Sequence, residues 1–245
     1  MPEGFLHHHA APHIRNRNGT SSNWSGYAVE TSLVSPQRNS VSDVQGRWIV
    51  PKISSSSSPD TYSVFRLGID GDDNNTVEQI GTEQDWTADG QQNYAWFEMY
   101  PHVGYVIEGF PVNVGDQIAA EVKYVSGGTF ALSITNLTQN QGYVVPMSLT
   151  RLKNAQRSSA EWIAEAPYSG GVLPLADFGT GYFSDCRATL NGVTGPVDNA
   201  PSWQYEAITM DVAKGGTIKA QPSGLDDSGK GANRTSSFSV EWYHE

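Results

Sequence analysis

The sequence predicts an all-β protein, and three observations support that fold class. Apolar and polar residues alternate in many runs of about five to ten residues, the pattern of a strand with one buried face. Gly, Ser, Asn and Asp separate these runs, as they do at turns between antiparallel strands. No stretch of about a dozen residues carries the 3.6-residue period of a helix. Short strands joined by turns form sandwiches or barrels, and 245 residues is an ordinary length for one such domain.

The clearest element is an antiparallel hairpin in the middle of the chain. Apolar and polar residues alternate along residues 117–126 and again along 129–135, and the turn between them is Ser126-Gly127-Gly128. Residues 142–150 are expected to add a third strand. Pro146 places that strand near a sheet edge or a bulge, because proline cannot donate to a ladder of hydrogen bonds.

Other runs with the strand pattern occur along the whole chain. They are residues 40–51, 62–70, 93–101, 160–167, 216–223 and 237–245. Two stretches rich in Ser, Gly and Asp, residues 53–60 and 221–237, are expected to be mobile loops.

The chain is expected to form a single domain over residues 21–245. The first twenty residues are polar and irregular, and they are interpreted as a flexible segment or the remnant of a pro-segment. Their tract His7-His8-His9 is more typical of a disordered chain start than of a metal site.

Composition argues against several classes of function. The net charge of -11 disfavours nucleic-acid partners, which are bound by basic stripes. No apolar run approaches the ~20 residues of a membrane span. The same charge fits a secreted protein, or one that works where carboxylates are partly protonated. The single cysteine, Cys186, allows no internal disulfide and is expected to be buried. We expect a monomer without metal or cofactor.

Familiar catalytic patterns are missing from the sequence. Neither the Gly-x-Ser-x-Gly turn of serine hydrolases nor the His-Glu-x-x-His zinc signature occurs. Five of the six histidines lie near the chain ends, and the sixth, His102, follows a proline in an expected loop. Acyl transfer by Ser, Cys or zinc is therefore not expected. Carboxylates and amides remain as candidates.

Glu161 and Gln79 are the candidates for chemistry. Glu161 lies in an apolar strand beside Trp162, where partial desolvation would raise its pKa and suit a general acid or base. Gln79 lies between Val77 and Ile80, and a buried amide must be hydrogen-bonded. A fixed amide N–H is also a good donor to a developing oxyanion. Considered alone, however, a Glu or Gln in an antiparallel strand usually faces solvent.

A series of motifs along the chain favours a functional role for Glu161 and Gln79. They are "SNWSGY" (22–27), "WIVP" (48–51), "LGIDG" (67–71), "VEQIGTEQDW" (77–86), "YAWFEMYP" (94–101) and "SAEWIAEAP" (159–167). Together they resemble the glutamic peptidases, also called eqolisins or peptidase family G1. The resemblance implies a concanavalin-like β-sandwich of two bent antiparallel sheets with a concave active-site groove. It also implies Gln79 and Glu161 as the catalytic pair of a secreted, pepstatin-insensitive acid endopeptidase that acts on polypeptides.

The resemblance also suggests residues that bind substrate. Trp96, Glu98 and Tyr100 match groove positions of the family and share one strand face by the period of two. Trp24, Asp70 and Trp162 complete the expected substrate-binding set.

The chain departs from the family pattern at three points. Arg66 stands where the family commonly has an aromatic residue, which changes the expected subsites. Either Glu83 or Asp85 could take the role of the family's nearby acid. Fungal members carry disulfides, so a chain whose single cysteine is Cys186 is more similar to the bacterial branch.

Two other classes of function, and an inactive relative, remain open on the sequence alone. A glycosidase could use Glu98 and Glu161 as its acid and base, and would give Gln79 no role. A non-catalytic carbohydrate-binding sandwich could stack Trp24, Trp96 and Trp162 on sugars. A family member that has lost its activity is a third possibility, which the presence of both Gln79 and Glu161 argues against.

Overall fold

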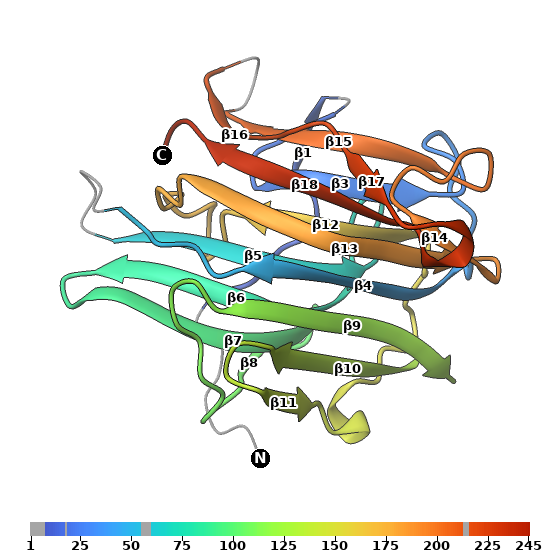
Figure 1. The fold of residues 1–245 in the computed structure, drawn as a ribbon, viewed down its shortest axis with the longest axis horizontal. Coiled ribbons are helices and arrows are strands. Elements are labelled where there is room, and N and C mark those ends of the chain that lie inside the picture. The colour runs from blue at the N-terminus through green and yellow to red at the C-terminus, as the bar shows by residue number, and fades with distance from the viewer. Residues whose placement is uncertain (1–7, 18, 55–59, 213–215) are drawn as a thin grey trace.

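The computed structural model describes residues 8–17, 19–54, 60–212 and 216–245, which form strands and two short 3-10 helices (Figure 1). The strands are β1 (Arg15–Arg17), β2 (Thr20–Ser21), β3 (Trp24–Glu30), β4 (Val41–Ile49), β5 (Thr61–Ile69), β6 (Val77–Thr87), β7 (Gly90–Tyr100), β8 (Tyr105–Val106), β9 (Gln117–Ser126), β10 (Thr129–Asn136), β11 (Gln141–Val144), β12 (Ser159–Glu165), β13 (Thr180–Leu190), β14 (Val193–Pro196), β15 (Gln204–Asp211), β16 (Ile218–Pro222), β17 (Asp226–Ser228) and β18 (Thr235–Trp242). The helices are η1 (Met147–Leu149) and η2 (Gly231–Asn233). Within these ranges no helix is long or apolar enough to cross a lipid bilayer.

The strands form two layers, which we call sheet I and sheet II. Sheet I has the order β15–β3–β12–β5–β6–β7–β8. Sheet II has the order β16–β18–β13–β4–β9–β10–β11, with β14 and β17 paired to β13 and β18. Strand β15 pairs with both β3 and β16, so the two sheets are joined along that edge. The predicted all-β sandwich is confirmed.

The hydrophobic core lies between the two sheets. On β5, Phe65 and Leu67 face this core, because alternate residues of a strand point to the same side. Trp48 of β4 and Ile118 of β9 meet them from sheet II. Trp48 also donates from Nε1 to the Thr82 hydroxyl at 2.9 Å, which satisfies its indole N–H inside the core.

The face of sheet I that points away from this core is polar, and it is buried as well. Its side chains come from the intervening strand positions, such as Arg66 on β5 and Glu161 on β12. Every residue of β12 is buried. A strand with two buried faces, one apolar and one polar, is unusual, because buried polar groups are costly unless they are paired. We call this surface the polar face.

Most predicted strands are confirmed, and the loops required one correction. The hairpin is β9 and β10, and Gly127 and Gly128 at its turn have φ of 59° and 77°, where glycine avoids strain. Strand β11 ends before Pro146 and lies at the edge of sheet II, as expected. The mobile loop expected over residues 221–237 is wrong in part. Strand β17 pairs there with the first residues of β18, and such short polar pairings leave little trace in composition. Within 53–60, residues 55–59 lie outside the described residues.

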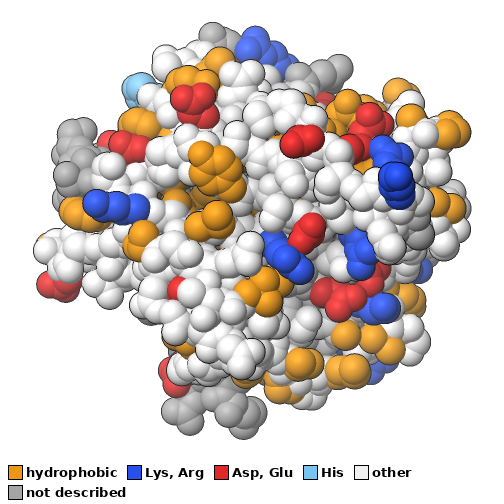
Figure 2. All heavy atoms as spheres, in the orientation of Figure 1, with side chains coloured by type: hydrophobic (Ala, Val, Ile, Leu, Met, Phe, Trp, Pro, Cys, Tyr) orange, Lys and Arg blue, Asp and Glu red, His pale blue; other side chains and the backbone are white. Residues whose placement is uncertain are grey.

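The outer surface of sheet II carries charges of both signs. Figure 2 views the molecule from the side of β4, β9 and β13, and basic and acidic side chains alternate on this face. Arg47 pairs there with Asp185 at 3.0 Å, and Lys123 pairs with Asp43 at 3.3 Å. This face therefore lacks the continuous basic stripe that nucleic acids require.

Candidate active site

Gln79 and Glu161 lie in one row across the polar face of sheet I. In the strand register Gln79 is directly opposite Gly68, and Gly68 is directly opposite Glu161 on its other side. Residues in one row point to the same face. Neighbouring strands are about 4.8 Å apart, so the two side chains start about 10 Å from each other. Gly68, which has no side chain, is the residue between them.

Glu98 fixes the orientation of the Gln79 amide. Glu98 is the next residue in the row, directly opposite Gln79 on β7. The Nε2 of Gln79 donates to Oε2 of Glu98 at 3.0 Å and to the backbone carbonyl of Ala10 at 2.6 Å. Both hydrogens of the amide are thereby used. The Oε1 of Gln79 is buried and has no hydrogen-bond partner among the described residues, so it is free to accept one.

Glu161 is fully buried, and neither of its carboxylate oxygens has a hydrogen-bond partner in the described part of the chain. Burial raises the pKa of Glu161 well above its usual value. The Arg66 guanidinium opposes this rise, while the charges of Asp70, Asp72 and Glu30 add to it. A carboxyl group in this position holds its proton tightly. It is a strong base once ionised, which suits proton transfer in both directions.

Arg66 places a buried guanidinium on this part of the polar face. Its Nε donates to Oε2 of Glu165 at 2.8 Å, and its Nη1 lies 3.7 Å from Oε1 of Glu161. Its plane lies over the Trp24 ring, 4.4 Å from the centroid. Nη1 also lies against Gly68, since a Cβ at residue 68 would come within 3.2 Å of it. Arg66, the residue that departs from the family pattern, therefore lies between Gln79 and Glu161, beside Gly68.

Two further carboxyl groups lie along the polar face near Glu98. Glu83 and Asp85 are both buried, and burial raises the pKa of each to about 8. The Tyr94 hydroxyl donates to Oδ2 of Asp85 at 3.2 Å. Of these three acids, Glu98 is the one that accepts a hydrogen bond from Gln79.

The expected substrate-binding residues divide into two groups. Trp24, Trp96 and Glu98 lie on the polar face. Tyr100 lies at the end of β7, where its ring meets that of His9 at 6.1 Å. Trp162 does not join them. It follows Glu161 directly, so the period of two turns its side chain into the core, where Nε1 donates to the Gln45 carbonyl.

Asp70 holds a loop in place, and its hydrogen bonds do not extend to Gln79 or Glu161. Its two oxygens accept from the backbone N–H groups of residues 156, 157 and 158 at 2.7–2.9 Å. The loop that precedes β12 is thereby held against the end of β5. The negative charge of Asp70 acts on the site at a distance: it contributes to the raised pKa of both Glu161 and Glu78.

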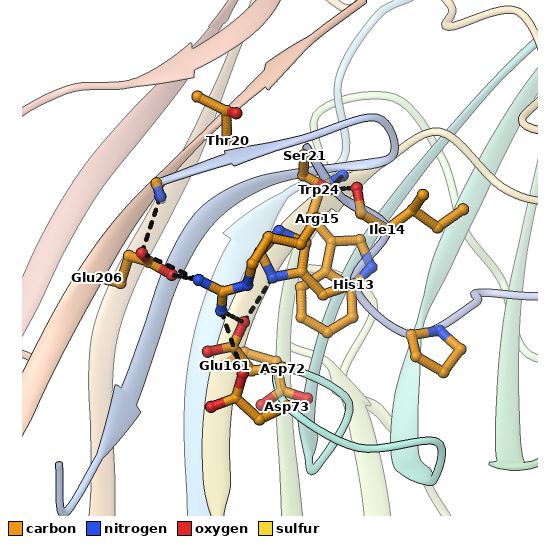
Figure 3. A network of polar contacts seen from close by, with 12 residues as sticks. His13, Ile14, Arg15, Thr20, Ser21, Trp24, Asp72, Asp73, Glu161 and Glu206 are labelled. Atoms are coloured by element: carbon orange, nitrogen blue, oxygen red, sulfur yellow. Dashed lines mark hydrogen bonds and ion pairs between the residues drawn. The ribbon is translucent and has the colours of Figure 1, made fainter. Parts of the chain in front are cut away.

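Residues 8–15 cross the polar face, which no pattern in the sequence predicted. We call this segment the strap. Ala10 and Ala11 are buried in it, and the Trp24 indole donates to the Ala11 carbonyl at 2.9 Å. His13 stacks on Trp24 with ring centroids 5.2 Å apart (Figure 3). The expected division into residues 1–20 and a domain from residue 21 stays a prediction, and residues 1–7 lie outside the described ranges.

Comparisons with known proteins agree with this geometry. The sequence profile of the Peptidase A4 family matches residues 22–225. Aspergillopepsin-2 of Aspergillus niger is 30% identical over 242 residues, which cover 88% of this chain and 80% of that protein.

Two solved structures are also similar. Scytalido-glutamic peptidase, solved with a transition state analog inhibitor, superposes with a TM-score of 0.67 at 25% identity. That match covers 91% of this chain and 98% of the other. SCP-B, an eqolisin solved in complex with the tripeptide Ala-Ile-His, gives a TM-score of 0.62 at 24% identity, over 91% and 98% of the two chains, and supports the fold. The profile match and the 30% identity together show that the chain belongs to the Peptidase A4 family.

Proposed function

We propose that this protein is an acid-acting glutamic endopeptidase in which Gln79 and Glu161 activate a water molecule and stabilise the oxyanion. One observation carries the assignment of these two residues. They flank Gly68 in a single row of sheet I, and among the described residues neither the amide oxygen of Gln79 nor the carboxyl group of Glu161 has a hydrogen-bond partner. Each alone would be a costly buried polar group. Together they form a site for a water molecule and a peptide carbonyl.

The reaction follows from the atoms that face this space. Oε1 of Gln79 accepts a hydrogen bond from the water, and the ionised Glu161 takes a proton from it. The water oxygen forms a bond to the carbonyl carbon, and the electron pair of the C=O bond moves to the carbonyl oxygen. Nε2 of Gln79 donates to that oxyanion, in the position where it now donates to Ala10. One such donor contributes about 10²–10³ in rate.

Glu161 completes the cycle by returning its proton. It gives the proton to the amide nitrogen, the C–N bond breaks, and the products are a carboxylic acid and an amine. Since water is the nucleophile, no covalent bond forms between protein and substrate. Positioned acid and base catalysis of this kind contributes about 10²–10⁴ in rate.

Glu98 serves this reaction as a positioning residue. It holds one hydrogen of the Gln79 amide and so directs the other hydrogen toward the carbonyl oxygen of the substrate. We further propose that the protein works outside the cell and is insensitive to pepstatin. The net charge of -11 supports the first point. The second follows from the site, since pepstatin is recognised by the paired aspartates of another peptidase class.

The two carbohydrate alternatives find little support in the geometry. Glu98 and Glu161 are three strand positions apart, about 14 Å at the backbone. The carboxyl groups of glycosidases are about 5–9.5 Å apart. Trp162 points into the core between the two sheets, so it presents no ring face to a sugar.

Digestion of a denatured protein from pH 2 to pH 7, with and without pepstatin and EDTA, tests the proposal. We expect cleavage in acid that neither inhibitor affects. The Glu161→Gln and Gln79→Ala variants should lose about 10² or more of this activity. Glu108→Gln, which changes an exposed glutamate in the same chemical way, is the matched control and should retain it.

Cleavage that persists in Glu161→Gln would assign the chemistry to another residue. A Gln79→Ala variant that cleaves like the unmodified protein would remove the oxyanion role.

A further inference from the structure

We propose that Arg66 is a third catalytic residue, whose terminal nitrogens donate hydrogen bonds to the carbonyl oxygen of the scissile peptide bond as it becomes an oxyanion. This inference rests on the proposed function and adds a second electrophilic group to the same site. It gives a chemical role to the residue at which this chain departs from the family pattern, since an aromatic ring carries no charged donor.

The guanidinium of Arg66 is fully buried, and only part of it is paired. Its Nε donates to Oε2 of Glu165 at 2.8 Å. The two terminal nitrogens, Nη1 and Nη2, have no hydrogen-bond partner among the described residues. They carry all the remaining N–H groups of the guanidinium. Buried donors without an acceptor are costly and call for an explanation. A peptide carbonyl from a bound substrate would supply the acceptor.

The unpaired nitrogens lie beside the residues that the proposed reaction uses. A Cβ at Gly68 would come within 3.2 Å of Nη1 of Arg66 and within 3.2 Å of the Cβ of Gln79. Nη1 also lies 3.7 Å from Oε1 of Glu161. Because Gly68 separates Gln79 from Glu161 in the strand register, the guanidinium is adjacent to both. A carbonyl group attacked between these two side chains would lie next to Nη1.

Two contacts hold the guanidinium of Arg66 in this position. Glu165 fixes Nε, and the guanidinium carbon lies over the Trp24 ring, 4.4 Å from its centroid. Glu165 is buried too, and its Oε1 accepts from Nδ2 of Asn23 at 3.4 Å. The donors are therefore oriented before a substrate binds. Preorganised donors in a buried site act strongly on a charge that develops during the reaction.

The distances favour the oxyanion over the resting state. At 3.7 Å, Nη1 is too far from Oε1 of Glu161 for a hydrogen bond. In the proposed reaction Glu161 takes a proton from water, so its negative charge is lost while a negative charge forms on the carbonyl oxygen. Arg66 keeps all its protons, because a guanidinium is not deprotonated in proteins. A hydrogen bond that forms only to the oxyanion lowers the barrier without tightening substrate binding.

A second role of Arg66 must be separated from this one. Its positive charge also opposes the rise in the pKa of Glu161. That effect needs only a charge, whereas donation to the oxyanion while Nε stays on Glu165 needs the forked guanidinium. Arg66→Lys distinguishes the two, because lysine keeps the charge but concentrates it in a single ammonium.

The test uses an octapeptide that carries one bond cleaved by the unmodified chain in the denatured-protein digestion, and two inhibitors made from it. In the first inhibitor a phosphinate replaces the scissile amide and presents a tetrahedral oxyanion. In the second a reduced amide, in which a methylene replaces the carbonyl, removes that oxygen. We expect Arg66→Lys to lower kcat about 10²-fold with little change in KM, and to weaken the phosphinate by a similar factor. The affinity for the reduced amide and the acid limb of the pH profile of kcat/KM should stay as they are.

The controls separate chemistry from folding. Arg47→Lys makes the same change on the outer face of sheet II, where Arg47 pairs with Asp185, and should behave like the unmodified chain. Circular dichroism and urea unfolding show whether each variant is folded. If the lysine variant does not fold, Arg66→Gln takes its place, and the phosphinate should again lose more affinity than the reduced amide.

Each contrary outcome has its own meaning. An Arg66→Lys variant with unchanged kcat would limit Arg66 to its charge on Glu161 and overturn the proposed donation. Equal weakening of the two inhibitors would overturn it too, since a merely structural role affects both alike. In both cases the unmodified chain still cleaves, and the peptidase proposal stands. No cleavage by the unmodified chain at any pH would overturn the proposed function itself, and the role of Arg66 with it.

Discussion

Raising the pH should destabilise this protein, and Glu83 allows the size of the effect to be worked out. Burial raises the pKa of Glu83 from its usual 4.5 to about 8, with Glu98 adding to the rise and the hydroxyl of Tyr94 opposing it. The folded protein therefore holds a proton that the unfolded chain releases. This contribution to stability is present below pH 4.5 and is lost as the pH rises to about 8. At about 1.4 kcal/mol per pH unit, the loss is about 5 kcal/mol.

Urea unfolding at pH 4.5 and pH 8.5 measures this effect. All proteins carry Glu161→Gln so that they do not digest themselves. The free energy of unfolding should be lower at pH 8.5, and Glu83→Gln, which has no proton to lose, should show a smaller difference. Glu108→Gln should show the full difference, because that glutamate is exposed. A protein that is more stable at pH 8.5, or a Glu83→Gln variant that loses as much as its parent, would refute the reasoning.

Three substitutions test other parts of the structure. Gly68→Ala places a methyl group 3.2 Å from Nη1 of Arg66, in the space where the peptide carbonyl is expected. Its kcat/KM should fall about 10²-fold with an unchanged circular dichroism spectrum, and full activity would show that the space is not used. Arg66→Met removes the cation beside Glu161, so the acid limb of the pH profile of kcat/KM should move to higher pH. A limb that does not move would separate Arg66 from that ionisation. Gly181→Ala would bring a Cβ to 2.2 Å from the Phe65 ring, and should lower the free energy of unfolding by about 1–3 kcal/mol with the pH profile unchanged.

The fold could be predicted because its signal is local. Alternation along residues 117–135 and the glycines of the turn are enough to define β9 and β10. Strand β13 escaped the sequence analysis for a local reason too. It carries a bulge at Ser184 and Asp185, where the register with β4 and β18 shifts, and an extra residue breaks the period of two.

The proposed catalytic pair rests on sequence motifs, whereas its surroundings could not be predicted from the sequence. Gln79, Gly68 and Glu161 become neighbours only when β5 inserts between β6 and β12. No pattern within a strand specifies which strands lie beside it. The role of Arg66 was hidden for the same reason, since its carboxylate partner Glu165 is 99 residues away.

Trp162 shows the opposite situation, in which the local pattern was the better guide. The period of two already separated it from Glu161, its neighbour in the chain. It was nevertheless expected among the substrate-binding residues, and the structure places it in the core. The polar composition around the histidines of the strap indicated a disordered chain start rather than a set of contacts. The partners of these histidines are distant in the sequence, as Glu98 is 89 residues from His9, so no local pattern indicates these contacts.

The polar face links the chemistry of the site to the conditions under which the protein is stable. Glu83, Asp85, Glu161 and Glu165 are all buried there, and Arg66 is the buried guanidinium that faces them. A buried carboxylate without a partner is unfavourable, whereas the neutral acid is tolerated. Such a face is therefore stable when most of these groups carry protons, and that requires acid. Glu161 must ionise in the proposed reaction, and the Arg66 guanidinium, which is paired with Glu165 at 2.8 Å, also lies 3.7 Å from Glu161. The buried carboxyl groups thus favour the folded state in acid, and the guanidinium lowers the cost of ionising Glu161 there.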